Sequence, residues 1–136
     1  MTLLSSMRFE GMGPSLAVAG ATTKAVFETY VEWALAPSLS PGQIVVMDNL
    51  SSHKGHRVRE LIEARGCELM YLPPYSPDLN PIEEAFAKLK VLLRKAGART
   101  REALLEAMGR ALDAVSASDA RGFFEPRGYH PLAQPL

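Results

Sequence analysis

The chain has 136 residues and carries fifteen acidic and fifteen basic side chains, so its formal net charge is zero. This length fits one domain of ordinary size, and an apolar content of 47% with 22% charged residues excludes a disordered or fibrous protein. The overall charge gives no sign of a nucleic-acid partner.

A β-hairpin followed by a helix is expected at the N-terminus. Residues 2–9 and 14–20 have the pattern of two strands, joined by a Glu-Gly-Met-Gly turn. Thr22 or Thr23 can cap the helix, which we expect to end before Pro37. Apolar side chains recur in it at helical spacing, namely Phe27, Tyr30, Val31 and Ala34.

Two short strands separated by a helix are expected next. Residues 43–47 form an apolar run that ends in Asp48, which is typical of a buried parallel strand whose end reaches a site. A helix from about residue 54 to 65 is stopped by Gly66, and residues 67–72 form the second strand.

Two long helices are expected in the C-terminal part. The first starts at Pro81 and ends near Gly97, with Ile82, Phe86, Leu89 and Leu93 along one face. Thr100 can cap the second, whose apolar stripe consists of Leu104, Met108, Ala111 and Val115. We expect one domain over residues 1–125 and a loosely structured tail over residues 126–136.

The alternation of strands and helices from residue 22 onward predicts an α/β fold, a mixed sheet covered by helices. In such sheets, ligands gather outside the carboxyl ends of the strands. Asp48 follows one strand directly, and Glu83 lies in the first turn of the helix after the next strand. If the two strands are parallel, the two carboxylates converge, and an Asp and a Glu together suit Mg²⁺ in phosphoryl transfer.

A proline-rich loop precedes Glu83, with four of the ten prolines between Pro73 and Pro81. Fixed φ angles in this loop limit the positions from which Glu83 can approach a metal. A simpler interpretation is helix capping, in which Asn80 is the N-cap, Pro81 the first helical residue and Glu83 the partner that closes a capping box.

The other polar residues near Asp48 also have simpler interpretations. Asp48 and Asn49 can form a turn that ends the strand. His53 can be a surface loop residue, and a serine-hydrolase site at Ser51 and Ser52 is disfavoured because the chain has no G-x-S-x-G elbow.

A basic run lies between residues 86 and 101, where no acidic residue occurs. It consists of Lys88, Lys90, Arg94, Lys95, Arg99 and Arg101. On its own, such a run indicates no more than a solvated helix face.

Side chains that are expected in the core include four aromatic ones, Phe27, Tyr30, Trp33 and Phe86. Cys67 is the only cysteine, so an internal disulfide is excluded, and we expect it to be a small buried side chain. The first thirty residues have no secretory leader pattern, and no apolar run approaches the roughly 20 residues of a membrane-spanning helix. We therefore expect an intracellular protein that does not enter membranes.

The stretches VVMDNLSSHK and LPPYSPDLNPIEEAFAKLK closely resemble the catalytic domain of bacterial insertion-sequence transposases in the mariner-related superfamily, a branch of the DDE transposases. The two acids enclose 34 positions, residues 49 to 82, which is the interval between the family's second Asp and its final Glu. The resemblance covers essentially the whole chain.

The resemblance implies an RNase H-like fold that uses Mg²⁺ or Mn²⁺ to nick DNA at transposon ends and to join the freed 3′-hydroxyl to target DNA. Asp48 matches the second catalytic acid and Glu83 the third, both as metal ligands, while Glu84 misses the spacing by one. Asn49 and His53 match positions that support the site without binding metal. The basic run becomes a candidate contact for DNA phosphates. A cytoplasmic, nucleoid-associated protein is implied, with a homodimer on paired DNA ends.

The chain departs from the family at the first catalytic Asp, because no aspartate precedes Asp48 and Glu10, the acid of the opening hairpin, falls in its turn. We therefore expect the C-terminal part of a transposase, without the first (central) strand and inactive alone. An upstream reading frame would supply the missing part as a partner. The alternative is a noncatalytic remnant that binds DNA or a full-length transposase.

Overall fold

The computed structural model describes residues 2–48, 55–73 and 80–127 of the chain. It contains, in chain order, β1 (Thr2–Leu4), β2 (Met7–Arg8), β3 (Gly11–Met12), β4 (Leu16–Val18), α1 (Lys24–Tyr30), the π-helical turn η1 (Val31–Leu35), α2 (Ala36–Ser38), β5 (Ile44–Met47), α3 (His56–Glu63), β6 (Glu68–Tyr71), α4 (Ile82–Ala96), α5 (Arg101–Asp113), α6 (Ala117–Phe124) and the 3₁₀ turn η4 (Glu125–Arg127). The predicted α/β class is confirmed, but the described strands form three two-stranded sheets and not one mixed sheet.

The predicted N-terminal hairpin is present as two short antiparallel ladders, β1 with β4 and β2 with β3. Arg8 pairs with Gly11, so the turn consists of Phe9 and Glu10 and is shorter than the predicted Glu-Gly-Met-Gly turn. Gly11 has a φ of 137°, and a Cβ there would lie 2.9 Å from the Val115 carbonyl oxygen. Glycine therefore allows the returning strand to pass close to the C-terminal helices.

The first helix begins as predicted but does not end before Pro37. The Thr23 hydroxyl caps α1 by accepting a hydrogen bond from the Val26 N–H at 3.2 Å. The helix then widens into η1, where the Ala36 N–H bonds the Val31 carbonyl oxygen, and continues as α2. Pro37 is the second residue of α2, directly after the wide turn, so the helix passes through the proline without ending there.

The remaining two strands, β5 and β6, pair in parallel, from Ile44 opposite Glu68 to Met47 opposite Tyr71. The carboxyl ends of both strands therefore lie at one edge, which is the condition for Asp48 and Glu83 to converge. The prediction of a buried strand is wrong for the start of β5, where Ile44 is 46% exposed, whereas Met47 at its end is buried. Alternate side chains of a strand point to opposite faces, and helices cover the face that carries Met47.

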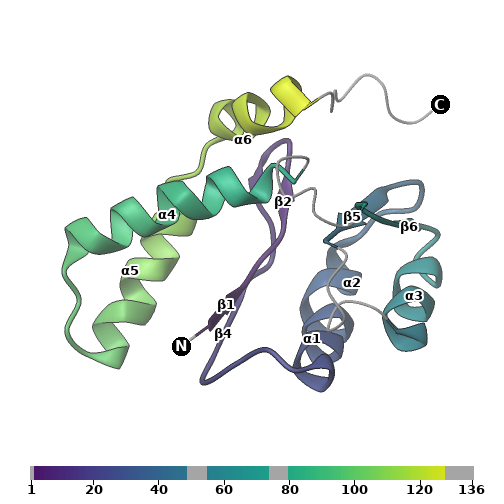
Figure 1. The fold of residues 1–136 in the computed structure, drawn as a ribbon, viewed down its shortest axis with the longest axis horizontal. Coiled ribbons are helices and arrows are strands. Elements are labelled where there is room, and N and C mark those ends of the chain that lie inside the picture. The colour runs from purple at the N-terminus through teal and green to yellow at the C-terminus, as the bar shows by residue number, and fades with distance from the viewer. Residues whose placement is uncertain (1, 49–54, 74–79, 128–136) are drawn as a thin grey trace.

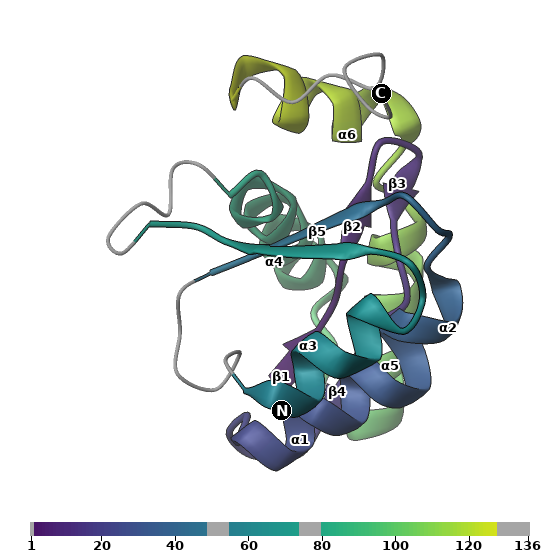
Figure 2. The same ribbon diagram turned by 90° about the vertical axis from the view of Figure 1, so that its right-hand side faces the viewer.

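Two hydrophobic clusters stabilise the fold on opposite sides of the hairpin (Figure 1). One joins α1, η1 and α3 to β5 and β6, and Leu4 and Leu16 of the hairpin pack against it. The other joins α4 to α5, and Leu3 and Met12 of the hairpin pack against that one. The hairpin thus forms a middle layer, with α6 crossing beyond its β2–β3 end (Figure 2).

The C-terminal helices confirm the predicted caps and add one element. α4 ends at Gly97, which adopts a left-handed φ of 61°, and Thr100 caps α5 through the Ala103 N–H at 3.1 Å. α6 was not predicted, although Ser116 and Asp119 form a capping box that the sequence contains. Of the predicted tail, Pro126 and Arg127 belong to η4, and residues 128–136 lie outside the described residues.

The predicted core is correct except for one aromatic side chain. Phe27, Tyr30 and Cys67 are buried and Phe86 is partly buried against the second cluster, but Trp33 is 75% exposed. Trp33 lies in the π-helical turn η1, and its place in the predicted core rested on its aromatic character alone. None of the helices in the described part of the chain is long and apolar enough to span a bilayer.

Candidate active site

Asp48 lies at the carboxyl end of β5, where the sequence places a candidate site. The pairing between the two parallel strands continues past β6, because the Leu72 N–H donates to the Met47 carbonyl oxygen at 2.8 Å. Asp48 is half-buried directly after Met47. Its carboxylate therefore lies at the edge where both strands end.

Asn80 connects this carboxylate to helix α4. Its side-chain Nδ2 donates to Asp48 Oδ1 at 2.9 Å, and its Oδ1 accepts a hydrogen bond from the Ile82 N–H at 3.2 Å. Ile82 is the first residue of α4. The first turn of α4 therefore lies beside Asp48, although Asn80 and Asp48 are 32 positions apart in sequence.

Glu83 and Glu84 lie in this first turn of α4, and both are exposed. Their negative charge is favourable at the positive end of the helix dipole. The capping differs slightly from the prediction, because Pro81 precedes the helix and Asn80 caps it through Ile82. The arrangement leaves the Glu83 carboxylate at the surface, in the same turn that Asn80 ties to Asp48.

The remaining predicted residues of the site fall in segments without a described structure. Asn49 and His53 lie within residues 49–54, and most of the proline-rich loop lies within residues 74–79. Both stretches are outside the described residues, so the predicted roles of Asn49 and His53 stay predictions.

The donor set of the site suits a hard divalent cation. Asp48 and Glu83 offer only oxygen atoms, which Mg²⁺ and Mn²⁺ prefer, and Mg²⁺ is usually held by one or two carboxylates together with substrate phosphates and water. Within residues 2–48, 55–73 and 80–127, no group of three or more His, Cys, Asp or Glu side chains could hold a metal ion. The carboxylates present therefore fit a cation as a partial set.

A positively charged stripe extends from Glu83 along the outer surface of α4. At 100° per residue, Glu83, Lys90 and Arg94 lie on one helix face, and all three are exposed. Arg94 and Lys95 also lie in the last turn, where positive charge is favourable. Arg99 and Arg101 are exposed just beyond it.

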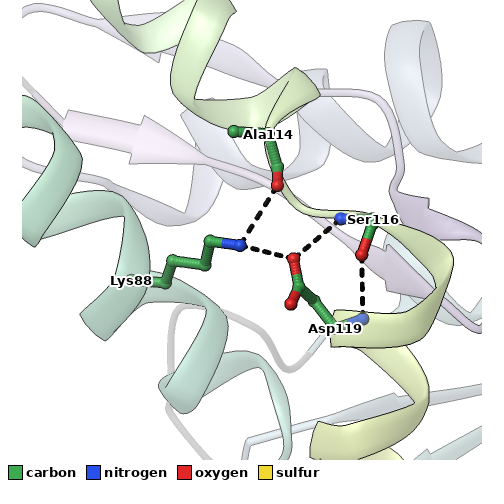
Figure 3. A network of polar contacts seen from close by, with 4 residues as sticks. All are labelled: Lys88, Ala114, Ser116 and Asp119. Atoms are coloured by element: carbon green, nitrogen blue, oxygen red, sulfur yellow. Dashed lines mark hydrogen bonds and ion pairs between the residues drawn. The ribbon is translucent and has the colours of Figure 1, made fainter.

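Lys88 differs from the other five basic residues of the run, because its ammonium group is engaged within the fold (Figure 3). It donates to the Ala114 carbonyl oxygen at 3.1 Å and forms an ion pair with Asp119. The Ser116 N–H also donates to Asp119, at 3.0 Å. Lys88 thus ties α4 to the start of α6, a role that sequence reasoning missed.

The Lys88 hydrogen bond, helped by the Ser116 N–H, lowers the pKa of Asp119 from 3.8 to about 2. A carboxyl whose pKa is lower in the folded state stabilises the fold above its unfolded pKa and loses that contribution as the pH falls through the folded value. We expect wild-type stability to fall between about pH 4 and pH 2 more steeply than that of Lys88→Met, which lacks the pair. Urea unfolding at successive pH values measures this difference.

Arg110→Met is a suitable control for this pH experiment. Arg110 forms a longer, exposed pair with Glu106, at 4.0 Å, and such pairs contribute little. Its variant should keep the wild-type pH profile. If Lys88→Met also keeps that profile, the ion pair does not stabilise the fold in solution.

A sequence profile for the DDE superfamily endonucleases matches residues 1–105, a span that includes both Asp48 and Glu83. The chain belongs to this family. No curated protein sequence is similar enough to count as a match.

Solved transposase structures have the same fold as this DDE family member. A crystal structure of the catalytic domain of Mos1 mariner transposase aligns with a TM-score of 0.70 at 19% identity, over 92% of this chain and 69% of that one. Two structures of the Mos1 transposase catalytic domain and Raltegravir, with Mn and with Mg, give TM-scores of 0.69 and 0.71 at 18% and 19% identity. They cover 94% of this chain and 76% and 75% of theirs. The mixed α/β fold is therefore RNase H-like, as the resemblance implied.

Proposed function

We propose that the chain is the catalytic part of a bacterial insertion-sequence transposase, which cuts DNA at transposon ends and joins the ends to target DNA. The observation that carries this proposal is the Asn80 contact, which ties the first turn of α4 to Asp48. It links the elements that carry two acids at the family's spacing, within a family match that spans both. A DDE endonuclease needs such a pair of acids for phosphoryl transfer.

Asp48 and Glu83 would hold Mg²⁺ or Mn²⁺ at the edge of the parallel sheet. With two such ions bound, one would activate the attacking oxygen and the other would stabilise the leaving oxygen during in-line displacement at a phosphate. The two structures of the Mos1 transposase catalytic domain with Mn and with Mg support the choice of metal. Asn49 and His53 would orient the site without binding the metal, as the Asp-Asn-x-x-x-His resemblance implies.

The DNA backbone would lie along the outer face of α4. Lys90 and Arg94 continue the face that carries Glu83, so a strand whose phosphate enters the site would meet positive charge next to it. Lys95, Arg99 and Arg101 extend the same charge beyond the helix end. We leave Lys88 out of this set because Asp119 already binds its ammonium group.

We further propose that a second polypeptide segment completes the catalytic set. No aspartate precedes Asp48 in the sequence, and Glu10 lies in the hairpin turn. Among the described strands, those of the hairpin pair only with each other, as do β5 and β6. A strand bearing an Asp, from the upstream part of a transposase, would pair with an open sheet edge, so the chain alone would be inactive.

The test combines the chain with the polypeptide encoded immediately upstream and measures nicking of terminal-repeat DNA. Nicking should require both polypeptides and either Mg²⁺ or Mn²⁺, and it should stop when the metal is chelated. A chain that nicks equally well alone would contradict the need for the second segment. Absence of nicking from the combined polypeptides would contradict the catalytic proposal.

Replacing Lys90 and Arg94 together by alanine should weaken DNA binding and its dependence on salt. Each phosphate contact that is lost reduces the slope of log K against log salt by about 0.9, so the pair should reduce it by about 1.8. Fluorescence anisotropy with a duplex at several salt concentrations measures the slope. Arg65→Ala, which removes an exposed charge after α3, should leave the slope unchanged. A loss in that control half as large as in the double variant, and so equal per charge removed, would mean that only net charge matters.

A noncatalytic role is the second candidate function, and the partial set of carboxylates favours it. In that case the chain would bind DNA or a full-length transposase. The basic stripe and the open sheet edges serve both candidates, so DNA binding does not separate them. Metal-dependent nicking by the combined polypeptides does. For the catalytic form we also propose a homodimer that acts on paired DNA ends at the nucleoid. This proposal rests on the family resemblance.

A further inference from the structure

Asn80 occupies an unusual position for a polar residue. Only 8% of its surface is exposed. If Tyr and Cys are counted as hydrophobic, Asn80 is the only buried polar or charged residue among those that the structure describes. A buried amide costs free energy unless its donors and acceptor are bonded. Its surroundings must therefore supply specific partners.

The two partners of Asn80 fix the orientation of its amide. The Nδ2 group donates to the Asp48 carboxylate, and the oxygen accepts from the Ile82 N–H. A reversed amide would place its oxygen against a carboxylate and its NH₂ against an N–H, so neither hydrogen bond could form. Only one orientation satisfies both neighbours.

Asn80 bonds only one of the two carboxylate oxygens of Asp48. Asn80 bonds Oδ1 at 2.9 Å, so Oδ2 can face a cation while the carboxylate is held. The amide is neutral and adds no charge beside the acids. It is also planar and short, so it sets the first turn of α4 at a fixed distance from the end of β5.

We propose that Asn80 is a positioning residue that orients Asp48 toward the cation and holds Glu83 in register with it. The proposal rests on the proposed function, because it requires both acids to bind one metal site. Hydrogen-bonded partners of metal ligands commonly change metal affinity by about 10- to 100-fold when they are replaced. A plain helix cap would not have this effect.

Three variants of the full chain separate positioning from capping. Asn80→Ser keeps a good capping oxygen but loses the amide that bonds Asp48, and Asn80→Ala loses both functions. Thr100→Ala is the control for the loss of a capping hydrogen bond alone, since the Thr100 hydroxyl caps α5 by accepting from the Ala103 N–H. Its hydrogen bond serves no carboxylate.

NMR titration with Mn²⁺ gives the readout, because paramagnetic broadening also detects weak binding. In the wild type, the resonances of Asp48 and Glu83 should broaden with one common midpoint. In Asn80→Ser and Asn80→Ala this common midpoint should rise about 10- to 100-fold, because the site binds the cation more weakly once Asp48 is no longer held. Thr100→Ala should keep the common midpoint even though its unfolding temperature falls. Without metal, Asp48→Ala should shift the Asn80 side-chain amide protons, since their acceptor is gone.

Three other results of the titration would contradict the role of Asn80, and the last of them would also contradict the metal site. A wild-type midpoint in Asn80→Ser, with Mn²⁺ binding lost in Asp48→Ala, overturns the role of Asn80 and leaves the proposed function standing. An equal change in Thr100→Ala reduces Asn80 to a cap. If the wild type shows no selective broadening at Asp48 and Glu83, both the proposed metal site and this inference fail.

Discussion

Asp48→Ala and Glu83→Ala should each reduce DNA nicking by the combined polypeptides at least about 1000-fold. A bound metal contributes several kcal/mol to stabilising the transition state of phosphoryl transfer, and about 4 kcal/mol corresponds to three powers of ten in rate. Asp48→Ala removes the acceptor of the Asn80 amide and Glu83→Ala an exposed side chain, but neither residue belongs to a hydrophobic cluster of the fold. The fold should therefore survive both. Single-turnover nicking of labelled terminal-repeat DNA at saturating Mg²⁺ measures the rate.

Glu84→Ala is the control for the Glu83 assignment. Glu84 is the adjacent carboxylate in the same first turn, it is exposed, and its loss changes the net charge equally. We expect nicking by this variant within a few-fold of the wild-type rate. An inactive Glu84→Ala beside an active Glu83→Ala would move the catalytic acid by one residue. Unchanged nicking in both Asp48→Ala and Glu83→Ala would remove the site altogether.

The parts of the fold that the sequence predicts well depend on local chemistry. Thr23 and Thr100 cap helices because a hydroxyl accepts from an N–H three residues on, and Gly97 ends α4 because glycine adopts the left-handed conformation freely. The parallel pairing of β5 with β6 was only a condition in the sequence argument. It is confirmed, and it places the ends of both strands at one edge.

The errors arise where distant contacts override a local pattern. Trp33 was placed in the core by its aromatic character, but it lies in the π-helical turn η1 and is 75% exposed. Pro37 was expected to end the helix, and the same turn instead places it at the start of α2. Lys88 belongs to a basic run in sequence, yet its partner Asp119 comes from a helix that was not predicted. No pattern within α4 could indicate that contact.

The candidate site shows the same division. The interval between Asp48 and Glu83 and the proline-rich loop are sequence features, and the prediction of the two acids rests on them. Asn80 was assigned only as a helix cap, since a single sequence contains no signal for its hydrogen bond to Asp48. That bond forms only once β5 and β6 pair and α4 begins next to their ends. The contact between Asp48 and the first turn of α4 is therefore a property of the tertiary structure.

Ile62→Ala should lower the free energy of unfolding by about 2–5 kcal/mol, a large share of the roughly 5–15 kcal/mol that stabilises a typical domain. Ile62 is fully buried in the cluster that joins α3 to β5 and β6, so its truncation leaves a cavity behind the strand that ends in Asp48. Ile44→Ala is the matched control, because Ile44 is 46% exposed on the other face of β5 and its loss should cost no more than about 1 kcal/mol. Urea unfolding followed by circular dichroism measures both midpoints at unchanged slope. Equal losses in the two variants would mean that the helices cover the Met47 face of β5 no better than the Ile44 face, and that Asp48 has no firm support from this cluster.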